Sequence, residues 1–170
     1  DKENVYMMHI IFENVINLFQ SVVVTVFLMA SLGCKDKYNK KCIGIIGIVT
    51  TFIYLTVSNH IAYFESVGIY IYMIYSLIFS FWVLGGTIIE KLFYNVMMIG
   101  CLAGSALLGV GLISLVIKKD FLNAIPFGTA SRYVSGILVQ LLLMLFLGFF
   151  IKLKKVLKEK DNKYMFTMSM

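Results

Sequence analysis

Long apolar runs alternate with short polar connections along this chain. The runs cover residues 8–32, 43–58, 67–84, 92–117 and 134–151. A helix of about 20 residues crosses the ~30 Å hydrocarbon core of a bilayer, so each run is close to the length of a membrane span. The runs are continuous, whereas a β-barrel has strands of about 10 alternating residues. We therefore expect an all-α polytopic transmembrane helical bundle of five spans.

Four polar connections separate the runs. Residues 34–42 (CKDKYNKKC) form a lysine-rich loop, and residues 59–66 form a link without Lys or Arg. Residues 85–91 (GGTIIEK) predict a tight turn. The longest connection, residues 118–133, contains Pro126, which indicates a further turn.

Composition and charge support this interpretation. The chain is 60% hydrophobic and 14% charged, whereas soluble domains have about 45–50% apolar and ~25% charged residues. The net charge of +6 comes from basic residues at the ends of the apolar runs. Anionic lipid headgroups explain this placement better than nucleic acid does. We expect a multi-pass protein of the cell membrane, with lipids and not nucleic acid as partners.

The lysines also predict the orientation. The last apolar run is followed at once by KLKKVLKEKDNK, at residues 152–163. Basic residues collect on the cytoplasmic side of membrane proteins, so the C-terminus is expected in the cytoplasm. Five spans then place the N-terminus outside, and most of the 15 Lys and Arg residues lie inside. Residues 1–151 form the predicted bundle, and residues 152–170 a cytoplasmic stem before a part of the protein absent here.

Two interpretations of the stem remain open. Leu153, Val156 and Leu157 have helical i, i+3, i+4 spacing, so the last span could continue as a helix for two or three turns. Alternatively, the basic segment could lie along the membrane surface.

The first apolar run has an unusual polar content. Glu13, Asn17 and Gln20 are spaced i, i+4, i+7 and therefore share one helix face. Polar groups in hydrocarbon are costly and normally face the bundle interior or a wet cavity. The face is either one wall of a ligand pocket or a set of interhelical hydrogen bonds.

The fourth run carries a strip of small residues. Gly100 and Gly104 are four residues apart, as are Cys101, Ser105 and Gly109. Small residues at this spacing let another helix approach closely. The approaching helix is expected from the same chain, with a dimer partner as the alternative.

A ligand site is predicted where three segments reach the same outer level. These are the outer half of the first span, the outer end of the third span, and the connection 118–133. Apolar walls with few polar groups are typical of small-ligand sites. The aromatic residues of the third span could instead form an interfacial belt. The predicted site residues are Glu13, Asn17, Tyr63, Tyr70, Phe121, Phe127 and Arg132.

Recognisable catalytic motifs are absent from the sequence. There is no HExxH, GxSxG or Walker A pattern, and Cys34 and Cys42 have no histidine nearby to complete a zinc site. We expect no enzymatic activity, metal or cofactor in these residues.

The layout resembles the N-terminal sensor region of GHKL-type histidine kinases, the accessory-gene-regulator class of quorum-sensing receptors in Gram-positive bacteria. The resemblance is carried by Glu13-Asn14, the lysine-rich loop, EKLFYNVMM at residues 90–98, Ser131-Arg132-Tyr133, and IKLKK at residues 151–155.

The resemblance implies reception of an extracellular ligand, often a small peptide, in a two-component system. It also implies that further spans, a dimerisation helix with the phospho-accepting histidine and an ATP-binding domain follow in a longer parent protein, which would be a homodimer. The alternative is a substrate-binding subunit of an energy-coupling-factor vitamin transporter, a class that usually has six spans.

The predicted orientation is testable by cysteine-accessibility labelling in intact cells. A probe at Asn123 should be modified, and one at Asn39 should not, because the positive-inside bias places them on opposite sides. The reverse pattern would contradict the orientation and the receptor hypothesis with it.

Overall fold

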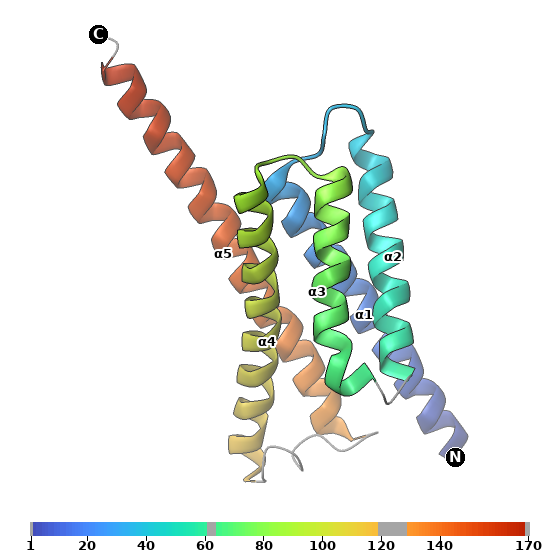
Figure 1. Cartoon of the computed structure of the whole chain (residues 1–170). Helices are drawn as coiled ribbons and strands as arrows, with labels where there is room; N and C mark the ends of the chain where they lie inside the picture. Colours follow the sequence, from blue (N-terminus) through green and yellow to red (C-terminus); the bar gives the residue numbers. More distant parts are fainter. Residues whose placement is uncertain (1, 61–63, 119–128, 169–170) are drawn as a thin grey trace.

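Five helices make up nearly all of the described part of the chain. The computed structural model describes residues 2–60, 64–118 and 129–168, and side chains for residues 6–59, 68–118 and 129–157. Its helices confirm the predicted all-α bundle (Figure 1), and this described part contains no strand, only an isolated bridge between Cys34 and Leu84. The five helices are α1 (Lys2–Leu32), α2 (Lys40–His60), α3 (Phe64–Val83), α4 (Ile88–Ile117) and α5 (Ala130–Met168).

The helices have the dimensions of a membrane protein. Within the described residues, α1, α2, α4 and α5 each contain a segment long and apolar enough to cross a membrane, and α3 contributes the shorter apolar segment Gly68–Val83. Large apolar side chains such as Trp82 and Leu145 are exposed on the outside. Polar side chains such as Ser21, Asn95 and Ser105 are buried inside. An apolar exterior around a partly polar interior is what lipid surroundings favour.

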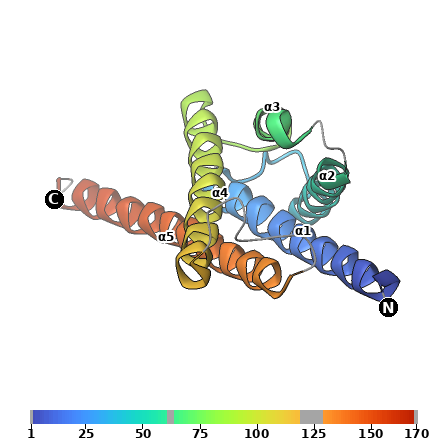
Figure 2. The same ribbon diagram turned by 90° about the horizontal axis from the view of Figure 1, so that it is seen from below.

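The helices form a closed ring in which α1 takes a central place. Each helix contacts the next one in the chain. In addition, α1 contacts α5, which closes the ring, and α1 also contacts α4. α1 and α5 run in the same direction, tilted behind the more upright α2, α3 and α4 (Figures 1 and 2). The N-terminus and the C-terminal end of α5 lie at opposite ends of the bundle.

The core lies between α1, α4 and α5. Phe27 and Leu28 of α1, Met98 of α4, and Leu143 and Leu147 of α5 are almost completely buried. The parallel pair of α1 and α5 therefore forms one wall of the core and α4 covers it.

The loops before α2 and before α4 meet at the stem end of the bundle. The Gly85 amide donates to the Gly33 carbonyl at 3.0 Å, and the Lys35 amide donates to the Val83 carbonyl at 3.2 Å. Gly33 has a φ of 71°, a left-handed conformation that glycine adopts at little cost. The two connections therefore hold the ends of α1 and α3 together.

The start of α4 differs from the predicted turn at residues 85–91. Thr87 caps the helix, its hydroxyl accepting from the Glu90 amide while the Glu90 carboxylate accepts from the Thr87 amide. This reciprocal capping box satisfies backbone donors that would otherwise be unpaired. Glu90 and Lys91 are thus in the first turn of α4 and not in the loop.

The stem continues α5 as a helix. α5 runs without interruption from Ala130 to Met168 and extends beyond the other four helices (Figure 1). Of the two interpretations left open by the sequence, the structure therefore favours the continuous helix. Its stripe of Leu153, Val156 and Leu157 is exposed.

The small-residue strip of α4 is only partly at a close contact. Cys101, Ser105 and Gly109 are buried, as expected. A Cβ atom added to Gly109 would lie 2.5 Å from Val139 Cγ2 and 3.4 Å from the Val139 backbone, so α5 crosses α4 there. A Cβ atom at Gly104 would meet no described atom within 4 Å. The expectation of close contact with a helix of the same chain is therefore wrong for Gly104, whereas at Gly109 the contacting helix is α5 of the same chain.

This crossing predicts a clear difference between two glycines of one helix. Gly109→Leu should destabilise the protein by about 1–3 kcal/mol, because the side chain collides with α5. Gly104→Leu should be neutral or stabilising, since it removes the ~1 kcal/mol penalty of glycine in a helix. Thermal unfolding in detergent measures both. Equal effects at the two positions would contradict this account of the α4–α5 contact.

Candidate functional site

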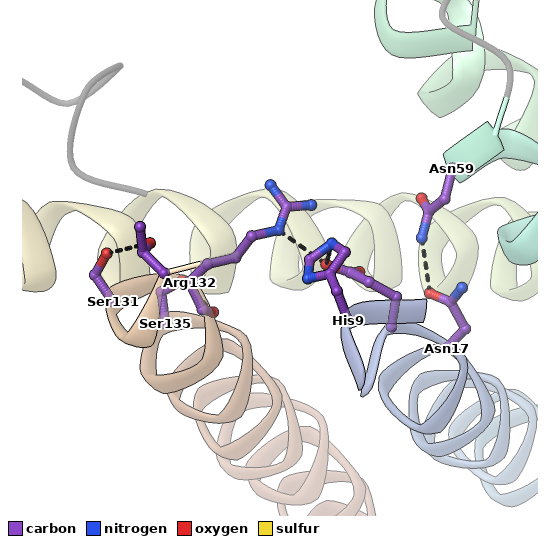
Figure 3. A network of polar contacts seen from close by, with 8 residues as sticks. His9, Asn17, Asn59, Ser131, Arg132 and Ser135 are labelled. Carbon is purple, nitrogen blue, oxygen red and sulfur yellow. Dashed lines mark hydrogen bonds and ion pairs between the residues drawn. The ribbon is translucent and has the colours of Figure 1, made fainter. Parts of the chain in front are cut away.

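The polar face of α1 contacts α2 and α5 along much of the bundle. Glu13, Asn17 and Gln20 each contact a polar side chain of another helix. Their partners are Arg132 of α5, Asn59 of α2 and Gln140 of α5. We call these contacts the polar seam; Figure 3 shows its end near the N-terminus.

An ion pair lies at this end of the seam. Arg132 Nε donates to Glu13 Oε1 at 2.9 Å, and His9 Nε2 lies 3.4 Å from the same oxygen. The side chains of Glu13 and Arg132 are 23% and 34% exposed, respectively. The carboxylate is thus placed between two basic groups at a partly accessible position, where a charged or polar ligand could compete for it.

The first turns of α5 are attached to α1 beside this ion pair. The Tyr133 ring meets the Phe12 ring edge-on, with centroids 4.7 Å apart. A Cβ atom at Gly136 would lie 3.2 Å from the Phe12 ring, so glycine allows the two helices to approach. At the helix start, the Arg132 amide donates to the Thr129 carbonyl at 3.1 Å. These contacts fix the direction in which α5 enters the bundle.

The next contacts of the seam are hydrogen bonds between amide side chains. Asn59 Nδ2 donates to Asn17 Oδ1 at 3.2 Å, and Gln140 Nε2 donates to Gln20 Oε1 at 3.0 Å. Such bonds satisfy polar groups that hydrocarbon cannot. Glu13, Asn17 and Gln20 therefore each have a hydrogen-bond partner on another helix, as the hydrogen-bonding interpretation of this α1 face predicts. A pocket beside the same face remains compatible with it.

A third contact joins α5 to the other end of α1. Lys154 Nζ donates to the Ser31 carbonyl in the last turn of α1, and it lies 4.8 Å from the centroid of the Tyr94 ring of α4. Lys35 similarly donates to the Phe81 and Trp82 carbonyls at 2.9 Å. Cations are favourable at helix C-termini, where carbonyls lack helical partners. The lysines at this end therefore help to hold the helices of the bundle together.

The structure brings together three of the seven predicted site residues. Glu13 and Arg132 form the ion pair, and Asn17 lies one turn deeper on α1. Tyr70 of α3 is 66% exposed and does not join these residues, whereas Tyr72 of the same helix is buried. The other three predicted residues, Tyr63, Phe121 and Phe127, lie outside the described residues.

Several residues that take part in these contacts were not among the predicted site residues. These are His9, Asn59, Gln140 and Lys154. His9 was recognisable, because it lies four residues before Glu13 and so on the same face. For the others, the sequence identifies a polar residue but not the helix that this residue contacts.

Metal ligation and similarity to known proteins give no further indication of the function of this site. Among the described residues, no group of three or more His, Cys, Asp or Glu side chains could hold a metal ion. Comparison of the chain with protein-family models, curated proteins and solved structures gave no match.

The ion pair predicts a measurable coupling between α1 and α5. Glu13→Gln and Arg132→Gln should each lower the melting temperature in detergent, because each removes one side of a partly buried ion pair between α1 and α5. The double variant should be less destabilised than the sum of the two, with a coupling energy of about 0.5–3 kcal/mol. Lys152→Gln, which removes an exposed charge of α5, is the matched control. Additive effects would show that the pair does not hold the helices together.

Proposed function

We propose that this chain is the membrane-embedded sensor region of a multi-pass receptor in the cell membrane. Its N-terminus lies outside and its stem in the cytoplasm. It detects an extracellular ligand, a small peptide, and passes the signal to a cytoplasmic histidine kinase module of a homodimeric parent protein.

One observation supports this proposal most directly. α5 is bonded to α1 at Glu13, Gln20 and Ser31, and continues beyond the bundle as the same helix. A rigid helix transmits displacement or rotation better than a flexible linker does. A change in α1–α5 packing at one end would therefore reach the stem at the other.

The polar seam is suited to two discrete packings. A ligand shifts a conformational equilibrium only if it binds one conformation better than the other. Groups that compete for the Glu13 carboxylate or the Gln20 amide would have such a preference, because they replace contacts between α1 and α5. Apolar contacts alone could slide gradually, whereas hydrogen-bonded side chains must exchange partners.

A substrate-binding subunit of a small-molecule transporter is the second candidate. It is favoured by a cavity of about 290 Å³ that residues of all five helices line. The exposed end of α5 and its continuous helix favour the receptor.

The receptor hypothesis predicts that kinase output depends on the helical phase of the stem. In the full-length parent, one to four alanines inserted after Leu157 rotate everything downstream by about 100° each. Basal autophosphorylation should change with one or two insertions and return with four, close to one full turn. Surface expression should remain constant.

The same insertions between Asp36 and Lys37, in the loop before α2, are the control and should leave the output unchanged. A steady decline of output with insertion length, or no effect at all, would contradict transmission through a continuous helix.

A further inference from the structure

A partly open cavity between the helices has the features of a binding site separate from the Glu13–Arg132 ion pair. Its volume is about 290 Å³, much more than one water molecule needs and near the lower limit of small-ligand sites. It lies in the half of the bundle that contains the start of α3. Residues that line it include Gln20 of α1, Ser58 of α2, Tyr72 of α3, Leu102 and Ala103 of α4, and Val139 of α5.

Two hydroxyl groups of the lining have unused hydrogen-bonding capacity. Tyr72 is only 4% exposed, and neither its hydroxyl nor that of Ser58 has a hydrogen-bond partner among the described residues. A buried polar group without a partner is costly, so most native structures satisfy it. A ligand with a hydrogen-bonding group would do so here.

The Tyr72 ring is held in a fixed position. It stacks on Tyr54 with centroids 5.3 Å apart, and Tyr54 is itself anchored by donating its hydroxyl to the Gly68 carbonyl at 2.5 Å. The Tyr72 hydroxyl therefore does not need to be ordered when a ligand arrives, which reduces the entropic cost of binding.

The lining also defines the class of ligand. None of the described lining residues carries a formal charge, and Leu102, Ala103 and Val139 provide an apolar wall. A charged ligand would lose its hydration without gaining an ion pair. A flat aromatic or similar apolar group with one polar atom would match both the wall and the hydroxyls.

We propose that this cavity binds a neutral, mainly apolar group with one hydrogen-bonding atom, which contacts the Tyr72 and Ser58 hydroxyls. The group belongs either to a free small molecule or to an aromatic residue of a small peptide. The chemistry of recognition is the same for both sources.

The cavity is also adjacent to the polar seam. Gln20 lines the cavity and accepts a hydrogen bond from Gln140, whose own Oε1 has no partner among the described residues. A bound ligand that engages Gln20 would compete with the α1–α5 contact. This coupling rests on the proposed receptor function, whereas binding in the cavity does not.

Binding can be tested on the purified chain in detergent with acetophenone and ethylbenzene. The two probes have similar shapes, but only acetophenone has a carbonyl that accepts a hydrogen bond. Acetophenone should raise the melting temperature of the wild type, and its affinity should fall about tenfold in Tyr72→Phe, the loss expected for one buried hydrogen bond. Ethylbenzene should bind both proteins equally.

Three controls separate binding from folding. Tyr70→Phe removes an exposed hydroxyl from the same helix and should bind acetophenone like the wild type. Ala103→Phe fills the cavity and should abolish binding of both probes. Without probe, Tyr72→Phe should melt at the same or a higher temperature than the wild type, because it removes an unpartnered hydroxyl; a lower value would show that the hydroxyl has a structural role instead.

N-acetyl-phenylalaninamide distinguishes the two sources of the ligand. If it binds as acetophenone does, a peptide side chain fits; if only acetophenone binds, the ligand is a free small molecule. The proposal is overturned if neither acetophenone nor the amide shifts the melting temperature, or if Tyr72→Phe binds acetophenone as tightly as the wild type. Because no kinase is involved, binding here together with a phase-independent stem would disprove only the receptor function.

Discussion

The requirement that polar groups inside a membrane protein be satisfied by other protein groups determines much of this structure. Hydrocarbon offers no hydrogen bonds, so a polar side chain on a spanning helix needs a partner from a neighbouring helix. α1 carries Glu13, Asn17 and Gln20 on one face, and each meets a polar group of α2 or α5. This requirement explains why α1 lies centrally, with α2 and α5 against its polar face.

Polar contacts are needed more to specify the pairing of α1 with α5 than to specify the other helix pairs. Neighbouring helices joined by short loops meet almost automatically, whereas Arg132 and Glu13 are 119 residues apart in sequence. Closing so long a segment has an entropic cost that only the final contacts can offset. From Glu13 to Ser31, α1 rises about 27 Å at ~1.5 Å per residue. Contacts at both ends and near the middle therefore fix the register of the pair across nearly the whole hydrocarbon thickness.

Hydropathy predicted the helices well because the membrane sets their length. The predicted ends at Leu32 and Ile117 agree with α1 and α4. The polar face of α1 was also predicted, because helical periodicity is a property of one helix. Its partners were not, since Asn59 and Gln140 become partners only through the tertiary arrangement. The contrast between Gly104 and Gly109 has the same origin: spacing identifies a strip of small residues, but the crossing point of α5 decides which glycine needs to be small.

The lysines at the stem end show how one set of residues can satisfy two constraints. Neither α1 nor α3 has a basic residue in its own last turn. Lys154 of α5 and Lys35 of the first loop instead donate to the carbonyls at these helix ends. Orientation in the membrane depends on the positive charge alone, whereas the helix-end contacts depend on where each amine lies. The effect on orientation and the effect on helix packing can therefore be separated. A lysine moved by one residue keeps the charge bias but loses the hydrogen bond. Lys154 is the position where this separation matters most, since its contact joins the stem to α1 at the point where α5 leaves the bundle.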